Sequence, residues 1–243
     1  MSVTVLELKD VWVSYPDEHG SLLKRLFKRE QKKFWALKGI SFSVKKGEVL
    51  GVIGRNGSGK STLLKLLSGL ILPDKGEFVR RGKRPVLLSL GAGFNPDLTG
   101  VDNIYLNSLL LGHKKEEVDE KLEEIIAFSE LGSFIHKPVR TYSAGMKARL
   151  AFATSIILDP DILLIDEVLG VGDEAFKEKS RQAILDKVAD NRTVVLVTHS
   201  ASLIKQVCDR VVWIHLGEQK AVGDTHEVIS AYQAFMRSQQ RSG

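Results

Sequence analysis

Short, uninterrupted apolar runs dominate the hydropathy pattern of the chain. They lie at residues 49–53, 162–165 and 194–197, and each is bounded by polar or turn-forming residues. A strand without a polar face is typical of a parallel sheet that helices cover on both sides. The pattern therefore predicts an α/β fold with a buried main sheet.

Strand patterns of a different kind flank these runs. Residues 3–8 and 11–15 predict two short strands, and residues 34–44 predict a third that ends at the turn Lys45–Glu48. We expect them to form an antiparallel sheet ahead of the first buried run. Near the end of the chain, residues 211–214 and 220–222 around Gly217 predict a hairpin, and a helix is expected over about 227–236.

Helical spacing fills the middle of the chain. Apolar residues recur with helical periodicity over 99–112, 114–131 and 148–157, and charged residues occupy the remaining positions of the second segment. We expect one domain, 1–243, with an α/β core at about 1–90 and 158–243 and an inserted helical subdomain at about 91–157. We find no internal repeat and no low-complexity linker.

The composition of the chain limits where the protein can reside and whether it can form disulfides. The chain has 243 residues, of which 43% are hydrophobic, and it carries a net charge of +5. Because no apolar segment approaches the roughly twenty residues that a membrane-spanning helix needs, we expect this chain to stay in the cytoplasm. The single cysteine, Cys208, cannot form an internal disulfide, and its helical surroundings favour a buried structural thiol.

A basic, amphipathic segment at residues 22–33 stands between the second and third predicted strands. Apolar residues share one helical face and cations surround them. The segment is compatible with two interpretations: contact with anionic lipid or a partner helix near a membrane, or a solvated excursion that packs locally.

An octapeptide after the run at 49–53 fills every fixed position of the phosphate-binding motif G-x-x-x-x-G-K-[ST]. The strand before it and the helical pattern after it are the context that this motif requires. Glycines let the backbone turn so that N–H groups and a helix N-terminus face nucleotide phosphates. Lys60 adds a positive charge and Ser61 a magnesium ligand. The residues expected to contact the nucleotide are Gly54, Arg55, Asn56, Gly57, Ser58, Gly59, Lys60, Ser61 and Thr62.

Two carboxylates directly follow the buried run at 162–165. Asp166 and Glu167 would lie at the edge of the sheet where the phosphate loop also opens. We expect Asp166 to hold magnesium and Glu167 to polarise the water that attacks the terminal phosphate. After the run at 194–197, His199 is positioned to hydrogen-bond the leaving phosphate, although alone it would more often be a surface or helix-capping histidine. Lys60, Glu167 and His199 are therefore the candidate catalytic residues.

The segment Tyr142-Ser143-Ala144-Gly145-Met146-Lys147 lies ahead of the acidic strand. Together with the phosphate loop, Asp166-Glu167, the Gly172-Asp173 turn and His199, it resembles the ATP-binding cassette (ABC) ATPases over essentially the whole chain. The resemblance implies a P-loop NTPase core, with a mixed sheet flanked by helices, an antiparallel β subdomain and an inserted helical subdomain. It also implies that ATP and Mg²⁺ are the cofactors.

The resemblance further implies a head-to-tail homodimer that sandwiches two ATP molecules. Ser143, Ala144 and Gly145 of one protomer would cap the γ-phosphate held by Lys60 of the other. Asp173 is a further residue that the resemblance implies for binding the cofactor. A serine that only caps its helix is the alternative for this segment. The small residues suit close approach of the helix N-terminus.

Tyr15 matches the position of the aromatic that stacks on adenine in this family. Such stacking contributes about 1–3 kcal/mol by analogy with nucleic-acid sites. Phe34 and Trp35 are competitors for the role, and a core aromatic is a further alternative.

The chain departs from the family at Leu90, where a glutamine usually senses magnesium and the transmembrane part. Leucine cannot ligate a metal, so Ser89 or a loop carbonyl replaces the contact or the contact is missing. The surrounding sequence is informative in another way. Residues 90–96 with 98–100, 34–37 and 166–173 all resemble the branch of the family that exports polysaccharides.

The resemblance to this branch implies a subunit that powers export of a lipid-linked O-antigen, capsule or teichoic acid through a separate transmembrane permease. The subunit would be peripheral to the cytoplasmic face of the inner membrane. Its contact with the polysaccharide would be indirect, and no nucleic acid is expected. Two alternatives remain: the ATPase of a lipid or drug exporter, and a non-transport relative that acts on nucleic acid or ribosomes.

Overall fold

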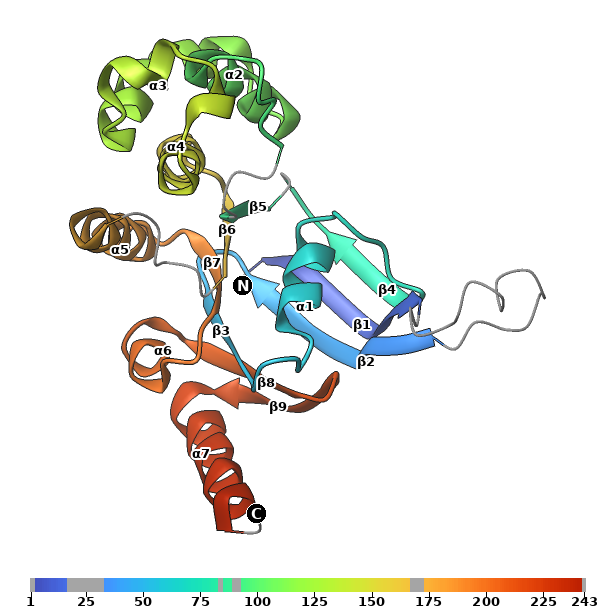
Figure 1. The fold of residues 1–243 in the computed structure, drawn as a ribbon. Helices are drawn as coiled ribbons and strands as arrows, with labels where there is room; N and C mark the ends of the chain where they lie inside the picture. The colour runs from blue at the N-terminus through green and yellow to red at the C-terminus, as the bar shows by residue number, and fades with distance from the viewer. Residues whose placement is uncertain (1–2, 17–32, 83–84, 89–92, 167–172, 242–243) are drawn as a thin grey trace, which may run out of the picture. The chain divides into compact units, whose positions relative to one another are not determined.

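The computed structural model describes residues 3–16, 33–82, 85–88, 93–166 and 173–241 (Figure 1). Its contacts divide the chain into two compact units. The first comprises residues 1–46, 50–81 and 199–243, and the second comprises residues 47–49 and 82–198. We call them unit 1 and unit 2.

Unit 1 is built on a six-strand arrangement in the order β4-β1-β2-β9-β8-β3. Parallel and antiparallel neighbours both occur, so the sheet is mixed. Its strands are β1 (Thr4–Pro16), β2 (Lys33–Lys45), β3 (Val49–Ile53), β4 (Lys75–Arg80), β8 (Arg210–His215) and β9 (Glu218–Asp224).

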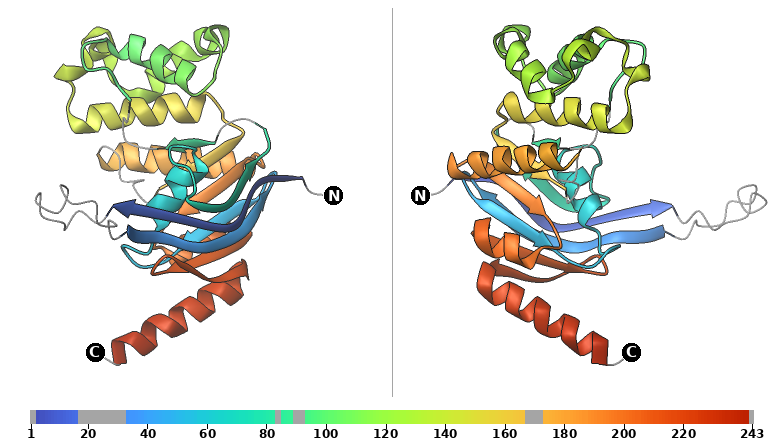
Figure 2. Two further views of the ribbon diagram at one scale, coloured as in Figure 1. Left: turned by 90° about the vertical axis from the view of Figure 1, so that its right-hand side faces the viewer. Right: turned by 60° about the vertical axis from the view of Figure 1, so that its left-hand side comes forward.

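The long strands β1 and β2 pair antiparallel and run side by side (Figure 2). This confirms the antiparallel sheet expected ahead of the phosphate loop. The two short strands predicted at 3–8 and 11–15 are wrong in one respect, because they form a single strand. Asp10 adopts a φ of 48°, and the pairing register shifts between Leu8 and Val11, so a bulge rather than a turn interrupts the pattern.

The buried strand β3 pairs parallel with β8, and β8 pairs antiparallel with β9. The predicted terminal hairpin is thus confirmed. Among its described residues, unit 1 also contains the helices α1 (Lys60–Leu67), α6 (Ala201–Val207) and α7 (Thr225–Arg241). The last helix begins two residues earlier and ends five residues later than the predicted 227–236, and it packs on β8, β9 and α6.

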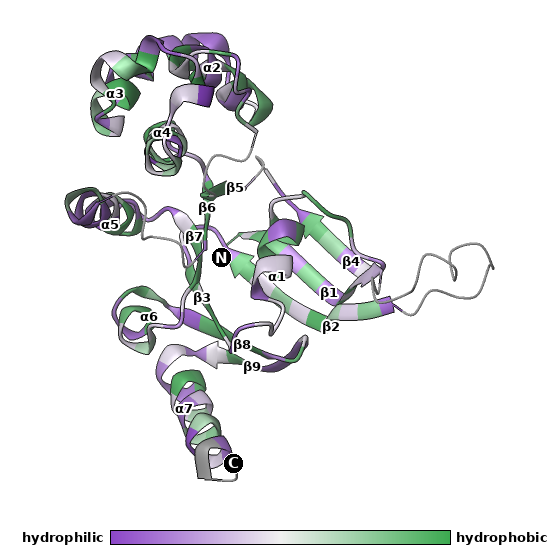
Figure 3. Cartoon of the chain, viewed as in Figure 1, coloured by the Kyte–Doolittle hydropathy of each residue, from purple (hydrophilic) through white to green (hydrophobic). Residues whose placement is uncertain are grey.

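Unit 2 contains three parallel strands in the order β7-β6-β5. They are β5 (Val86–Leu88), β6 (Ile162–Ile165) and β7 (Thr193–Val197). Every residue of β6 and β7 is buried, as the unbroken apolar runs predict, and Figure 3 shows the hydrophobic colour of these strands.

The helices of unit 2 are α2 (Gly100–Leu110), α3 (Lys115–Ser129), α4 (Ala144–Ile157) and α5 (Glu174–Ala189), with the 3₁₀ turns η2 (Gly132–His136) and η3 (Val139–Thr141). Helices α2, α3 and α4 share an apolar core that includes Ile104, Ile125 and Leu150. The helix predicted over 148–157 in fact begins at Ala144, because the Ser143 hydroxyl accepts a hydrogen bond from the Met146 N–H and caps it.

Candidate nucleotide-binding site

The phosphate-binding octapeptide connects the buried strand β3 to helix α1 (Figure 1). Helix α1 begins at Lys60, directly after Gly59, which has a φ of 108°. A side chain at this φ would be strained, so a glycine is required where the loop turns into the helix. The strand, loop and helix follow in the order that the motif predicts.

Two glycines of the loop lie directly against backbone carbonyls of neighbouring strands. A Cβ on Gly54 would clash with the carbonyl oxygen of Ile214 in β8. A Cβ on Gly59 would lie 2.6 Å from the carbonyl oxygen of Ala36 in β2. The loop therefore depends on β2 and β8 for its shape.

The Lys60 side chain is buried within the loop. Its Nζ donates hydrogen bonds to the carbonyl oxygens of Gly54 at 2.8 Å and Arg55 at 3.1 Å. These bonds hold the positive charge of Lys60 against the loop, where a phosphate chain is expected.

The N-terminus of α1 fits a phosphate because no side-chain hydrogen bond caps it. The side chains of Thr99, Ser143, Asp173 and Ser200 cap α2, α4, α5 and α6, whereas the N-cap residue of α3, like that of α1, makes no side-chain cap hydrogen bond. The first N–H groups of a helix need an acceptor, and an anion is favoured at this end of the helix dipole. The donor set of this loop therefore suits the phosphates of ATP.

Tyr15 lies at the end of β1 beside the helix that follows the phosphate loop. Its hydroxyl is 3.5 Å from the hydroxyl of Thr62. Trp35 instead packs edge-on against Trp12, with the Lys75 ammonium 5.2 Å from its ring centre. Phe34 pairs with Tyr15 across the sheet and is 60% exposed. Trp35 is thus engaged elsewhere, whereas Phe34 remains a competitor for adenine.

In unit 2, Ser143 and Ala144 are exposed at the start of α4, and Gly145 is half-buried. A Cβ on Gly145 would meet no other heavy atom nearer than the Ser143 hydroxyl oxygen at 3.8 Å. The space next to this glycine is therefore open within the described residues. Ser143 already caps this helix by accepting the Met146 N–H, so an anionic group from outside the protomer would meet the other N–H groups of the first turn.

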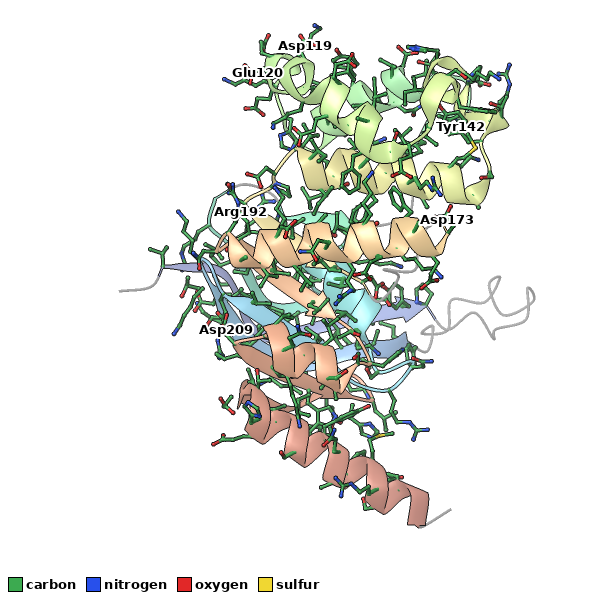
Figure 4. The ribbon with its side chains drawn as sticks, turned by 90° about the vertical axis from the view of Figure 1, so that its left-hand side faces the viewer. Asp119, Glu120, Tyr142, Asp173, Arg192 and Asp209 are labelled. Carbon is green, nitrogen blue, oxygen red and sulfur yellow. The ribbon has the colours of Figure 1, made fainter. Side chains whose placement is uncertain are left out.

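Asp173 lies at the N-terminal end of α5, as Figure 4 shows. Its carboxylate accepts the Phe176 N–H at 3.0 Å and forms an ion pair with Arg149 of α4. The Phe176 N–H, and then the Arg149 guanidinium, lower the pKa of Asp173 below its ordinary value. The sequence analysis missed Arg149, although its position one turn after the Ser143–Gly145 segment was a usable signal.

The remaining candidates lie at strand ends or outside the described residues. Asp166 follows β6 and is half-buried, and His199 follows β7 and is exposed. Glu167 and Leu90 fall outside the described residues, so the expectations placed on them stay predictions. The basic segment 22–33 is described only at Lys33, whose Nζ lies 3.7 Å from the Asp74 carboxylate.

The oxygen ligands that Mg²⁺ prefers are available on the candidate residues. Ser61 offers an exposed hydroxyl in the first turn of α1, and Asp166 offers a carboxylate. Within the described ranges, no group of three or more His, Cys, Asp or Glu side chains could hold a metal by itself. Each of these two residues, Ser61 in unit 1 and Asp166 in unit 2, thus carries an oxygen of the kind that suits Mg²⁺. The same part of the chain contains no helix long and apolar enough to span a membrane.

Comparison with known proteins decides the family. A model of the ABC transporter family matches residues 37–170, more than half of the chain. The chain belongs to the ABC transporter family. The family predicted from the phosphate loop and the Ser143–Gly145 segment is thus confirmed.

Relatives of this ABC protein carry the names of polysaccharide exporters. The O-antigen export system ATP-binding protein RfbB of Klebsiella pneumoniae is 44% identical over 96% of this chain and 98% of its own length. RfbB of Myxococcus xanthus is 50% identical over 81% of this chain but 45% of its own length. The teichoic acids export ATP-binding protein TagH of Enterococcus faecalis is 46% identical over 88% of this chain and 48% of its own length. The chain therefore spans about half of the last two relatives. Its resemblance to the polysaccharide-export branch is confirmed.

Solved structures confirm the fold. An ATP-binding subunit of an ABC transporter superposes with a TM-score of 0.75 at 23% identity and covers 94% of this chain and 93% of its own. An ATP-binding cassette solved as a dimer in a post-hydrolysis state with ADP and phosphate has a TM-score of 0.71 at 24% identity, over 90% of this chain and 98% of its own. The predicted α/β fold of the P-loop type is thus correct.

Proposed function

We propose that this chain hydrolyses ATP to power the export of a lipid-linked polysaccharide through a separate transmembrane subunit. The observation that carries the proposal is the phosphate loop at the uncapped start of α1, in a chain whose relatives are named for O-antigen and teichoic acid export. We propose the cytoplasmic face of the inner membrane as its location, where it is held by the permease.

The chemistry follows from this chain's own residues. Lys60 and the loop amides bind the phosphates, and Tyr15 stacks on adenine beside Thr62. Glu167 accepts a proton from the attacking water, and His199 donates a hydrogen bond to the leaving phosphate. A magnesium ion held by Ser61 and Asp166 would neutralise phosphate charge.

We also propose that the protein acts as a head-to-tail homodimer. The exposed Ser143 and Ala144 and the open space at Gly145 support a contact with ATP held by Lys60 of a second protomer. The domain plan that we propose keeps a single ABC-type domain, with an α/β core at about 1–90 and 158–243 and a helical subdomain at about 91–157. No nucleic acid is part of the proposed cycle.

The proposal is tested by co-purifying the chain with the transmembrane protein encoded beside it and measuring ATP hydrolysis with and without lipid-linked polysaccharide. We expect a complex whose rate of ATP hydrolysis changes with polysaccharide.

Lys60→Ala should reduce ATP hydrolysis by about 100-fold or more, because it removes the cation from the phosphate site. Lys65→Ala, which changes an exposed lysine of the same helix, is the matched control and should leave it unchanged.

Other results would redirect the proposal. Stimulation by another lipid or a drug, with no response to polysaccharide, would assign the chain to a different exporter. A chain that purifies alone and whose hydrolysis responds to RNA or ribosomes would overturn the transport assignment. Unchanged hydrolysis in Lys60→Ala would overturn the phosphate site itself.

A further inference from the structure

The turn between β8 and β9 forms a support beneath the phosphate loop. The Gly217 N–H donates to the carbonyl oxygen of Ser58 at 3.0 Å, and the Lys38 N–H donates to the carbonyl oxygen of Gly217 at 2.8 Å. Gly217 therefore links the loop to strand β2 through its two backbone groups. Both hydrogen-bond partners of Gly217 are held in place, because Ser58 is buried and Lys38 lies in β2, a central strand of unit 1.

The Gly217 turn and the phosphate loop both pack closely against β2, and the loop also packs against β8. Gly217 has a φ of 83°, and a Cβ there would lie 2.8 Å from the carbonyl oxygen of Ala36. That same carbonyl oxygen is the one that lies against Gly59, and the carbonyl oxygen of Ile214 lies against Gly54. A displacement of the turn would therefore be transmitted to both ends of the phosphate loop.

One face of β8 packs against the C-terminal helix α7. The β8–β9 register shifts between Trp213 and Ile214, but Trp213 and His215 share one face, because both rings contact Phe235 of α7. The Phe235 ring of α7 has its centre 5.2 Å from Trp213 and 4.9 Å from His215. Figure 2 shows α7 next to the hairpin strands, and Phe235 thus contacts the last residues before the turn.

We propose that Phe235 is a positioning residue for nucleotide binding, which acts through His215 and the Gly217 turn on the phosphate loop. The packing of helix α7 against β8 then sets the affinity of the loop for phosphates.

The physical basis is preorganisation. A loop that already has its bound conformation loses less conformational entropy when the phosphates bind, and it therefore binds them more tightly. Loss of the ring frees the end of β8 and lengthens or breaks the hydrogen bond between Gly217 and Ser58. The inference concerns binding by the chain itself, so it stands whichever molecule is transported.

The test measures the binding of a fluorescent methylanthraniloyl derivative of ADP to the purified chain. A diphosphate is used because it probes the loop without hydrolysis. Phe235→Ala should weaken binding by about three- to tenfold, the equivalent of a lost aromatic contact. Phe235→Tyr keeps the ring and should restore binding to within about twofold.

Two controls separate positioning from stability. Val228→Ala removes buried apolar surface from the first turn of the same helix, away from the aromatic contacts, and should lower the melting temperature without weakening nucleotide binding. Gly217→Ala should weaken binding by more than about tenfold through backbone strain. Gly223→Ala in the adjoining strand, where a Cβ would meet nothing within 4 Å, should not change it.

The proposal is overturned if Phe235→Ala and Val228→Ala weaken binding equally, since a general loss of stability would then explain both. It is also overturned if Gly217→Ala binds like the unaltered chain. Should Phe235→Ala not fold, Phe235→Leu keeps apolar volume without the ring and must show the same loss of affinity.

Discussion

The Cys208 thiol is buried beside β3, and burial raises its pKa from 9.0 to about 12. The folded protein then keeps a proton that the unfolded chain releases above pH 9. The stabilisation from this group is complete below pH 9 and is lost as the pH rises from 9 toward 12. Over this range we expect the free energy of unfolding to fall by about 1.4 kcal/mol per pH unit.

This pH dependence is measured by denaturant unfolding at pH 8, 9 and 10 for the unaltered chain and for Cys208→Ala. The substitution removes the titrating thiol but leaves the lysines and tyrosines, which act as an internal control. The unaltered chain should lose stability faster above pH 9. Equal losses in the two proteins would show that the thiol ionises normally in the folded state.

Single residues differ in how far the sequence could predict them. The phosphate loop was predictable because its glycines and Lys60 have a fixed spacing that backbone geometry requires. The contact of Gly217 with Ser58 was not, because residues far apart in the chain meet only through strand pairing. Asp10 was equally hidden, since a positive φ at an aspartate leaves no distinct pattern in the sequence.

At the scale of elements, Asn103 fixes the segment that leads into α2. The side chain is fully buried, and its Nδ2 donates to the carbonyl oxygens of Asn95, Leu98 and Thr99. Its Oδ1 accepts the Asn95 N–H at 2.8 Å. One amide thus contacts four backbone groups of this loop, with its two N–H hydrogens shared among three carbonyl oxygens.

We expect Asn103→Ala to lower the free energy of unfolding by about 2–4 kcal/mol, because it removes the side-chain hydrogen bonds to this loop and leaves a cavity at a fully buried position. The control is Asn107→Ala on the same helix, which removes one hydrogen bond to the Asn103 carbonyl and should cost about 1 kcal/mol or less. Chemical denaturation of both variants gives the two values. Equal losses would mean that the loop obtains its stability elsewhere.

Elements with a strong apolar period were predictable, and exposed or very short ones were not. The sequence analysis assigned β6 and β7 because burial on both faces leaves an unbroken apolar run. It missed β4, a largely exposed edge strand with the sequence KGEFVR, and β5, which has three residues. It also missed α5, whose buried positions Phe176, Ser180 and Ile184 include a polar residue that interrupts the apolar stripe.

At the scale of the whole molecule, the proposed ATP contacts are divided between the two units. Lys60 belongs to unit 1, whereas Ser143 and Gly145 belong to unit 2. In the proposed dimer, a nucleotide held by one protomer is completed by α4 of the other. The proposal therefore predicts that ATP drives dimer formation and that the surface at Gly145 controls it.

The substitution Gly145→Leu tests this surface without disturbing the protomer. Its side chain enters space in which only the Ser143 hydroxyl lies within 4 Å of a Cβ, and leucine has a higher helix propensity than glycine. The free energy of unfolding of the protomer should therefore stay unchanged or rise by up to about 1 kcal/mol. Dimer formation should fail, because the leucine occupies the position at which the partner's phosphate approaches.

The readout is the molar mass in solution with ATP and Mg²⁺ in a Glu167→Gln background, which should accumulate the ATP-bound dimer. Gly223→Leu, in another open site, is the matched control and should dimerise normally. If Glu167→Gln/Gly145→Leu still dimerises, the interface does not involve the start of α4. If Glu167→Gln itself hydrolyses ATP at the unaltered rate, the assignment of Glu167 as the general base is wrong, because its carboxylate would then be dispensable for activating water.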